Sequence, residues 1–219
     1  GDLLEAPHRS GVDAVTKETF ERITRRNQFD IVYENMLRLI EQNFKLRINC
    51  IVLEGQNEQE IVPLLELTKY HNVSVRFLEE MPFNGGVKSF HKIRWDYKAI
   101  YKYISERFDG IEELKSPLTS TAINYKIPGH IGTFGIIPSF SRTFCGSCNR
   151  LRISATGDVI TCLYGKPRMN IRALLRSENC NEKISAEIER AIGSRSKTGF
   201  EEQQRYKDVF KNSMTSIGG

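Results

Sequence analysis

Residues 45–82 read "KLRINCIVLEGQNEQEIVPLLELTKYHNVSVRFLEEMP", and this stretch decides the fold class. Its first part, residues 45–55, mixes apolar and β-branched residues as strands do. Asn57 with Glu60 three positions on predicts a capping box, and therefore a helix whose apolar positions face a sheet. Residues 72–82 again have the composition of a strand. A strand, a helix and a strand in such close succession predict a βαβ unit with parallel neighbouring strands, within an α/β sheet or barrel.

The carboxyl ends of these strands indicate where a ligand is expected. Ligands in α/β folds lie beyond that edge, so Glu79, Glu80 and Met81 stand where chemistry would take place. The alternative for Met81 is a packing role, in which its flexible side chain only fills the mouth of a barrel.

Helices are predicted upstream of the βαβ unit. Thr16 is a candidate cap for one helix, and a second helix runs from about residue 31 to residue 43. Residues 1–11 show no period and contain Pro and Gly, so we expect an irregular start.

The character of the sequence changes downstream. Residues 96–108 form an amphipathic helix, and residues 120–141 are short alternating runs broken by Pro and Gly, which predict β-hairpins. Beyond Asn170 the chain returns to helix and ends in a polar, lysine-rich tail. We therefore expect an α/β part at 1–84 and a C-terminal part at 85–219.

Composition limits the function classes. In 219 residues, 39% are hydrophobic and 27% charged, which is ordinary for a globular protein and excludes wholesale disorder. No apolar run approaches the roughly 18–20 residues that span a bilayer. Five cysteines, three of them clustered, favour metal chemistry in a reducing compartment over a disulfide framework. The cytoplasm is the default location, and no membrane partner is expected.

The clustered cysteines lie in "TFCGSCNRLRISATGDVITCLYGKPR", residues 143–168. Cys145 and Cys148 form a C-x-x-C pair. Two strand-like runs joined at Gly157, which can adopt the positive φ of a tight turn, predict a hairpin that folds Cys162 back beside this pair. The sequence therefore predicts a metal or cluster site with three cysteine ligands.

The identity of a fourth ligand stays open at this point. A structural zinc site needs four protein ligands, and Cys50, Cys180 and the histidines, His130 nearest among them, are the candidates. A [4Fe–4S] cluster held by only three cysteines would instead keep one iron open for a substrate atom. Arg150 and Arg152 follow the C-x-x-C pair and, on a strand, would share one face.

Positive charge accumulates around these cysteines. Arg142, Arg150, Arg152, Lys166, Arg168, Arg172 and Arg176 are opposed by one acid, Asp158. Part of this charge balances anionic thiolates, and the rest favours an anionic ligand such as phosphate, or forms a solvated basic face.

The segment "FCGSCNRLRISATGDVITCLYG" closely resembles the C-terminal cluster motif of the molybdenum cofactor biosynthesis protein A family, the radical S-adenosylmethionine GTP 3′,8-cyclases. The runs "VDAVTKETFERITRRN", "RINCIVLEGQNEQEIVPLLEL" and "VRFLEEMPF" and the closing "IGG" resemble family segments in the same order. The resemblance implies a partial, incomplete TIM-type βα barrel followed by a C-terminal α+β cluster-binding region.

The resemblance also implies ligands for several residues. The cysteines matching Cys145, Cys148 and Cys162 hold a [4Fe–4S] cluster whose free iron contacts the GTP purine. The substrate is bound by Arg150, Arg152 and, where many members have a lysine, Arg47. Met81 matches a methionine that contacts S-adenosylmethionine, and Gly218 and Gly219 match a tail that reaches towards the active site. No residue is assigned to the catalytic step itself.

This sequence departs from the family pattern at its N-terminal side. The family holds a first [4Fe–4S] cluster with a C-x-x-x-C-x-x-C motif that does not occur here. Gly11-Val12-Asp13 stands where members typically read Ser-Leu-Asp. We therefore expect a chain that lacks the family's N-terminal part and cannot by itself cleave S-adenosylmethionine.

For the intact enzyme, the resemblance implies that a 5′-deoxyadenosyl radical abstracts the ribose 3′ hydrogen of GTP and the sugar radical attacks C8 of guanine. The product is the precursor of cyclic pyranopterin monophosphate, so the synthase of that compound is the expected pathway partner; a homodimer is also allowed. Two rivals remain: a zinc-stabilised nucleic-acid-binding module, disfavoured because no aromatic-basic interleaving surrounds the arginines, and a single-cluster electron-transfer protein.

Overall fold

The computed structural model describes residues 8–81, 93–117, 120–141, 145–148, 150–177 and 179–206. The chain folds into two compact units. The first consists of residues 1–80 and 92–141, and the second of residues 81–91 and 142–219.

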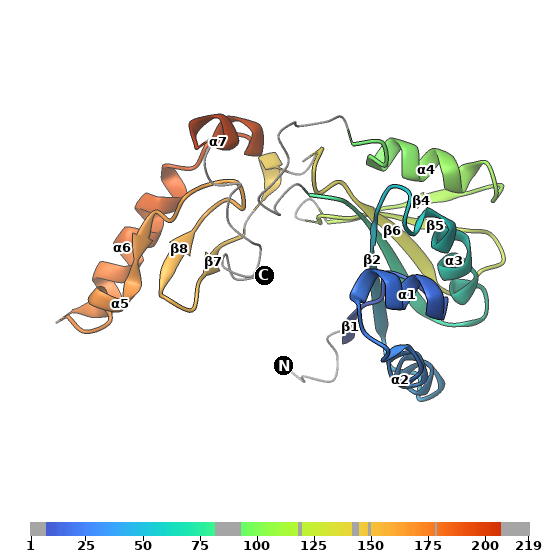
Figure 1. Cartoon of the computed structure of the whole chain (residues 1–219). Helices are drawn as coiled ribbons and strands as arrows, with labels where there is room; N and C mark the ends of the chain where they lie inside the picture. The colour runs from blue at the N-terminus through green and yellow to red at the C-terminus, as the bar shows by residue number, and fades with distance from the viewer. Residues whose placement is uncertain are drawn as a thin grey trace. The chain divides into compact units, whose positions relative to one another are not determined.

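The first unit is an α/β layer built on one mixed sheet (Figure 1). Its elements are β1 (His8–Gly11), α1 (Lys17–Thr24), α2 (Phe29–Glu41), β2 (Leu46–Val52), the short 3-10 helix η1 (Glu58–Glu60), α3 (Ile61–Tyr70), β3 (Val73–Glu79), α4 (Tyr97–Ser105), β4 (Glu112–Leu114), β5 (Ile123–Lys126) and β6 (Thr133–Ile137). The strand order is β1-β2-β3-β6-β5-β4, with the first four strands parallel and the last two antiparallel to their neighbours.

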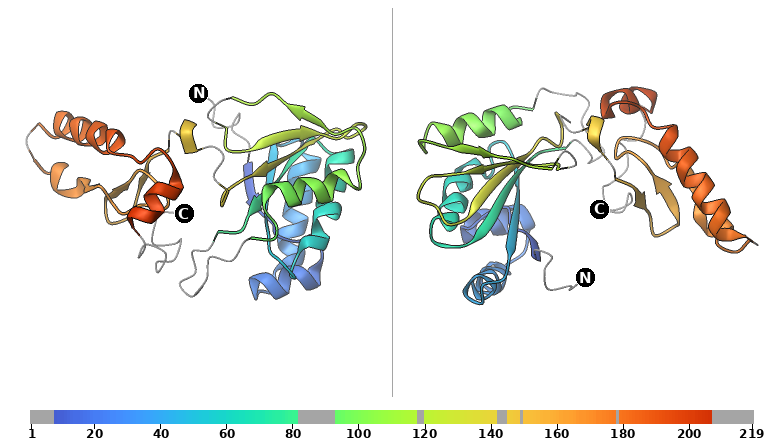
Figure 2. Two further views of the ribbon diagram at one scale, coloured as in Figure 1. Left: turned by 90° about the horizontal axis from the view of Figure 1, so that it is seen from above. Right: turned by 180° about the vertical axis from the view of Figure 1, so that it is seen from behind.

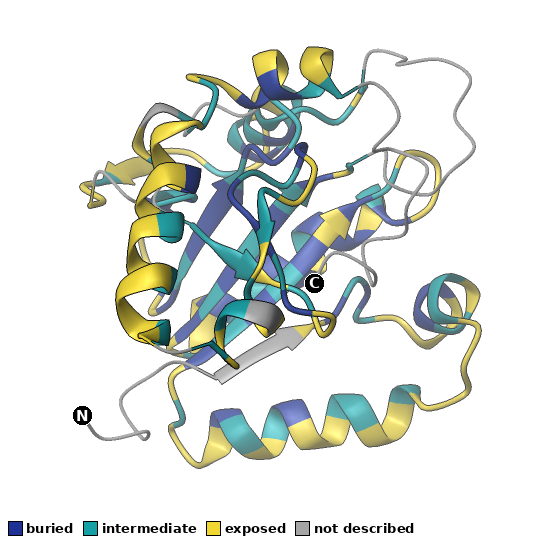
Figure 3. Cartoon of the chain, turned by 90° about the vertical axis from the view of Figure 1, so that its left-hand side faces the viewer, coloured by how far each residue is buried: buried dark blue, intermediate teal, exposed yellow. Residues whose placement is uncertain are grey.

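Alternation along the strands places the core on one face of this sheet. On β2, Leu46, Ile48, Cys50 and Val52 are buried while the residues between them are more exposed. Helices α2, α3 and α4 cover the buried face with apolar side chains such as Met36, Leu64 and Ile100 (Figure 2). Figure 3 shows the buried and intermediate colours alternating along the central strands, whereas the helices carry exposed outer faces.

The predicted βαβ unit is confirmed. β2 and β3 pair in parallel from Leu46 opposite Val73 to Val52 opposite Glu79, with α3 between them in the sequence. The α/β class is therefore confirmed as a mixed sheet, and part of a closed barrel remains a prediction. The run 120–141 forms the antiparallel pair β5 and β6, and β6 also pairs in parallel with β3, so it belongs to the sheet of the first unit.

Two local predictions are wrong. The expected irregular start at residues 1–11 contains β1, because its backbone pairs with β2 from His8 opposite Leu46 onwards, although its side chains show no pattern. The predicted capping box does not form. Asn57 binds the backbone of Asp13, Ile51 and Leu53 through its side chain, and the Glu60 carboxylate accepts hydrogen bonds elsewhere.

Glu60 instead joins α3 to the start of α1. Its carboxylate, 1% exposed, accepts hydrogen bonds from the backbone N–H groups of Val15 and Thr16 and from the Thr16 hydroxyl. Thr16 is the cap residue of α1, as predicted, but its side chain makes no capping bond because it is engaged with Glu60.

Among its described residues, the second unit holds a small antiparallel sheet, one turn of 3-10 helix and three α-helices. Its elements are η2 (Cys145–Ser147), β7 (Arg152–Ile153), β8 (Asp158–Ile160), β9 (Met169–Asn170), α5 (Ile171–Leu174), α6 (Cys180–Gly193) and α7 (Gly199–Arg205). The predicted β7–β8 hairpin is confirmed, and Gly157 in its turn has a φ of +87°. Helix α7 occupies part of the stretch expected to be a polar tail. Among the helices described, none is long and apolar enough to cross a membrane.

Candidate functional site

The cysteine loop of the second unit opens with one turn of 3-10 helix. Cys145 is the first residue of η2, and the Cys148 N–H donates to the Cys145 carbonyl oxygen at 3.3 Å. This turn presents the two thiols of the C-x-x-C pair from one short segment. All three cysteines are free and partly buried.

Cys162 lies two residues after the end of β8, and the charges of the other two thiols influence it. Burial raises the pKa of Cys162 above its ordinary value, a hydrogen bond from the backbone of Tyr164 opposes the rise, and the charges of Glu202, Cys145 and Cys148 add to it. Three thiols that influence one another in this way repel as thiolates, and a metal centre would remove that repulsion.

Three cysteines are a donor set that a [4Fe–4S] cluster can use. Among the residues described, no three His, Cys, Asp or Glu side chains are grouped to hold one metal ion. In a [4Fe–4S] cluster each cysteine ligates a different iron, so three thiolates serve it without converging on one point.

The other candidate fourth ligands have partners or positions of their own. His130 belongs to the first unit, is 8% exposed, and its Nδ1 lies 2.8 Å from the Thr68 hydroxyl oxygen. Cys50 is fully buried in β2, where burial raises its pKa well above the usual value. Cys180 is the first residue of α6.

Arg150 lies two residues before β7, and Arg152 is the first residue of that strand. Burial lowers the pKa of Arg152, the neighbouring positive charge of Arg150 lowers it further, and Cys148 and Cys162 raise it. The structure therefore brings two guanidinium groups and two of the three thiols within electrostatic reach of one another. An anion that binds beside them would offset the repulsion between the arginines.

Met81 packs in the second unit. It contacts a small apolar cluster built on Ile160 and Tyr164, to which Cys162 also belongs. This places its thioether near the third cysteine, and the packing alternative accounts for the contact equally well.

Glu79 has a structural role. Its carboxylate is 1% exposed and accepts hydrogen bonds from the N–H groups of Tyr97, Phe140 and Ser141, each at 2.7 Å, and from the Ser141 hydroxyl at 2.8 Å. These bonds tie the end of β3 to the first residue of α4 and to the segment after β6.

Arg47 has a second arginine on its face of the sheet that sequence reasoning missed. Arg47 on β2 lies opposite Ser74, and Asn49 lies opposite Arg76 on β3, so both arginines project from the face that α2, α3 and α4 do not cover. Arg47 and Ser74 also line a shallow pocket. The two-residue alternation from Ser74 to Arg76 is the sequence signal that would have identified Arg76.

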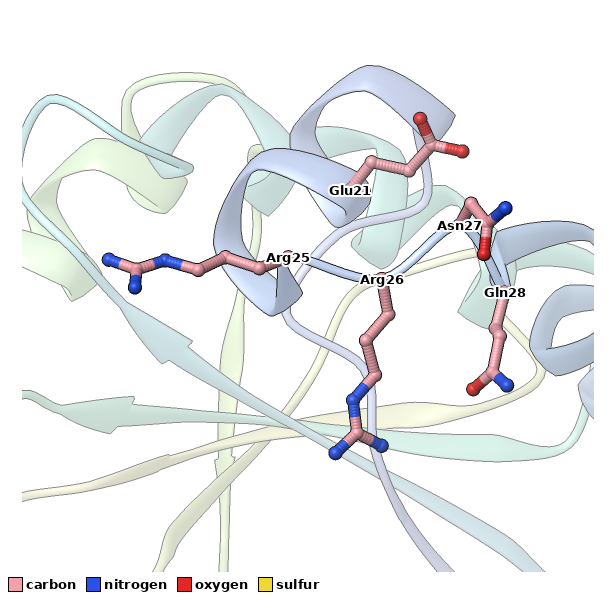
Figure 4. Close-up of a pocket in the computed structure, with 5 residues that line it drawn as sticks. All are labelled: Glu21, Arg25, Arg26, Asn27 and Gln28. Carbon is pink, nitrogen blue, oxygen red and sulfur yellow. The ribbon is translucent and has the colours of Figure 1, made fainter.

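The side chains that line a second pocket do not converge on a point where a ligand would bind. It lies at the C-terminal end of α1 and is lined by Glu21, Arg25, Arg26, Asn27 and Gln28. In Figure 4 the side chains of Arg25 and Arg26 point in different directions instead of converging on a ligand.

Some of the predicted site residues are not described by the structure, and one already has a partner. Gly218, Gly219 and Arg142 lie outside the described residues. Arg168 belongs to the basic run, but its guanidinium is paired with the buried Glu202 and is therefore not available to an anionic ligand. Sequence reasoning also missed Arg195 and Gly199, which contact the cysteine loop from the far end of the chain.

Residues 73–201 match the family described as Molybdenum Cofactor Synthesis C. This chain belongs to that family. The match covers β3, the β5–β6 pair and nearly all described residues of the cysteine unit.

Curated relatives extend the likeness. Molybdenum cofactor biosynthesis protein 1 of Mus musculus is 38% identical over 183 residues, which are 83% of this chain and 29% of that protein. The mitochondrial GTP 3′,8-cyclase of Arabidopsis thaliana is 32% identical over 95% of this chain and 53% of its own length. The GTP 3′,8-cyclase of Chlorobaculum tepidum is 31% identical over 95% of this chain and 62% of its own length. The chain thus spans between about a third and two thirds of these relatives.

Proposed function

We propose that this chain provides the substrate and C-terminal cluster site of a GTP 3′,8-cyclase in molybdenum cofactor biosynthesis. The observation that carries the proposal is the mutual electrostatic influence of Cys145, Cys148 and Cys162 and of Arg152 with Arg150, Cys148 and Cys162, all within the family match. Two relatives named GTP 3′,8-cyclase cover nearly all of this chain.

In this proposal the three cysteines hold a [4Fe–4S] cluster, and Arg150, Arg152 and Arg47 bind the substrate. A cluster with three protein ligands supplies an open coordination position for a purine atom. Guanidinium groups form charge-assisted hydrogen bonds with phosphate oxygens, so the arginines would fix the triphosphate while the base is oriented at the cysteines. Arg76 shares the face of Arg47 and can contribute to the same charge.

The remaining expectations follow from the same proposal. Met81 would contact S-adenosylmethionine, and Gly218 and Gly219 would reach the substrate. No residue of this chain is assigned to the first cluster, because its C-x-x-x-C-x-x-C motif does not occur in the sequence. The reaction product would pass to cyclic pyranopterin monophosphate synthase, and the free thiols fit a reducing compartment such as the cytoplasm.

Anaerobic reconstitution with iron and sulfide tests the cluster. The full chain is expected to become brown and to bind about four irons, as a [4Fe–4S] cluster requires. Replacing Cys145, Cys148 and Cys162 by Ser should abolish the uptake, whereas Cys180→Ser should not. A colourless chain with one zinc per molecule would contradict the proposal and favour the zinc-binding alternative.

Calorimetric titration of the reconstituted chain with GTP tests the substrate site. The double variant Arg150→Ala/Arg152→Ala should weaken GTP binding by at least about tenfold for each lost charge-assisted contact of roughly 1.5–3 kcal/mol. The matched control is Arg25→Ala/Arg26→Ala, which removes the same charge from the loop after α1. Equal GTP affinity in the two double variants would refute the assignment of the arginines.

A further inference from the structure

The segment between α6 and α7 forms hydrogen bonds with the loop that carries Cys145 and Cys148. Arg195 donates from Nη1 to the carbonyl oxygen of Cys148 and from Nη2 to the carbonyl oxygen of Arg150, the latter at 2.7 Å. One planar guanidinium thus fixes the carbonyl groups of two residues that are two positions apart. The rigid fork of arginine suits this double contact, and lysine cannot reproduce it because its ammonium is a point charge.

The same segment reaches the first cysteine. The backbone N–H of Gly199 donates to the Cys145 Sγ at 3.3 Å. A hydrogen bond to a ligand sulfur is one of the factors that set the reduction potential of an iron–sulfur cluster. The bond stabilises the more negative, reduced form, so its loss makes the potential more negative.

A buried ion pair anchors this segment to the hairpin that carries Cys162. Glu202, 1% exposed, accepts hydrogen bonds from the Ser196 hydroxyl and from the Arg168 guanidinium. The backbone N–H of Arg168 donates to the Val159 carbonyl oxygen on β8 at 2.8 Å. Glu202 therefore links the segment that forms hydrogen bonds with Cys145 and Cys148 to β8, the strand that precedes Cys162.

Gly165 makes this close approach possible. Its N–H donates to the Cys162 carbonyl oxygen at 2.9 Å, and a Cβ at this position would lie 2.6 Å from the Glu202 carboxylate. Glu202 packs directly against the turn that follows the third cysteine. The contacts run without a gap from Cys162 through Glu202 to the segment that carries Arg195.

We propose that residues 194–199 are a positioning element for the three-cysteine site, in which Arg195 fixes the geometry between Cys148 and Arg150 and the Gly199 N–H tunes the cluster through Cys145. This inference rests on the proposed function and adds residues that lie far from the cysteine motif in the sequence. It predicts separate effects: Arg195 governs substrate binding, and Gly199 governs the reduction potential.

Variants of Arg195 test the first effect in the full, reconstituted chain. Arg195→Met should weaken GTP binding about tenfold, since Arg150 loses its fixed carbonyl, and should change the electron paramagnetic resonance spectrum of the reduced cluster. Arg195→Lys should recover only part of the affinity. The matched control is Arg190→Met, because Arg190 is exposed on α6 and pairs only with Glu187 among the described residues.

Variants of Gly199 test the second effect. Gly199→Pro removes the N–H, and the backbone accepts it because proline is tolerated at the first residue of a helix and Thr198 before it is extended, with φ −132° and ψ 156°. The proline ring takes the place of the hydrogen that points at the Cys145 sulfur, so this variant also displaces that sulfur. Gly199→Ala adds a side chain but keeps the N–H. A redox titration should give a more negative potential for Gly199→Pro than for Gly199→Ala.

The outcomes separate the inference from the proposed function. If the wild-type chain takes up no iron–sulfur cluster, the proposed function fails and the inference fails with it. If the wild type is loaded and binds GTP but Arg195→Met and Arg195→Lys behave like Arg190→Met, only the inference is overturned. Equal reduction potentials for Gly199→Pro and Gly199→Ala would also overturn the inference and leave the proposed function standing.

Discussion

Replacing Glu79 by Gln should destabilise the first unit without touching the cysteine site. The amide keeps one acceptor oxygen and presents an NH₂ donor where the carboxylate accepts. If that NH₂ replaces the oxygen that binds Tyr97 N–H and the Ser141 hydroxyl, the hydroxyl can reverse its role, but the Tyr97 N–H loses its acceptor.

The magnitude follows from these bonds. A buried donor without a partner costs about 1–3 kcal/mol, and the bonds from Phe140 and Ser141 weaken because a neutral acceptor replaces a charged one. We expect a loss of roughly 2–4 kcal/mol for Glu79→Gln. Glu79→Leu would leave three N–H groups without an acceptor and cost roughly 3–9 kcal/mol, close to the whole stability of a typical domain.

The single tryptophan provides the assay. Trp95 packs edge-on against Tyr103 of α4, with ring centroids 5.2 Å apart, so its fluorescence reports unfolding of the first unit in urea. Glu34→Gln is the control, because the Glu34 side chain makes, within the described part of the chain, only an exposed pair with Arg38 at 3.8 Å, worth at most about 1 kcal/mol. If Glu79→Gln unfolds at the same urea concentration as Glu34→Gln but fails to bind GTP, Glu79 is a functional residue and the structural interpretation is refuted.

Three further predictions concern stability. Burial lowers the pKa of His130, so the unfolded chain binds a proton below about pH 6.5 before the folded chain does, and the free energy of unfolding should fall as pH drops through that range; urea unfolding followed at Trp95 at pH 7.5 and 5.5 should show a smaller pH effect for His130→Gln, and an unchanged one would contradict this. Gly132→Ala should cost about 1–3 kcal/mol in the same assay, because its Cβ would lie 2.3 Å from a backbone carbonyl oxygen; Gly193→Ala, with open space at its Cβ, should cost nothing, and equal effects would be inconsistent with the packing described. Gly157→Ala should lower the melting temperature in circular dichroism, because a φ of +87° in the hairpin turn costs an alanine about 1–2 kcal/mol, and a melting temperature equal to that of the wild type would show that the turn relaxes.

Signals within one element were sufficient where a single period or turn determined the structure. The apolar and β-branched composition of residues 45–55 predicted β2, and Gly157 predicted the β7–β8 turn, because both depend on backbone geometry over a few residues. The two-residue alternation on β3 places Arg76 on the same face of the sheet as Arg47. That the two arginines share a face is evident only once the pairing of β2 and β3 is known.

Local signals failed where a polar side chain had a choice of partners. Asn57 and Glu60 have the spacing of a capping box, yet Asn57 binds the backbone of Asp13, Ile51 and Leu53, and Glu60 binds the start of α1. The Asn57 amide and the Glu60 carboxylate would find hydrogen-bond partners in either arrangement. Only the placement of the start of α1 beside η1 brings the Val15 and Thr16 N–H groups within reach, and the sequence contains no local sign of it.

The sequence by itself determined the α/β class and the family resemblance and predicted the cysteine ligands, because these depend on residue type and short spacing. The tertiary structure alone decided that β1 joins the sheet, that β6 pairs with β3, and that Arg195, Gly199 and Glu202 surround the cysteine loop. These contacts join residues far apart in the chain. They form because buried carboxylates, carbonyls and N–H groups must find partners wherever the fold brings them, and no short pattern records that requirement.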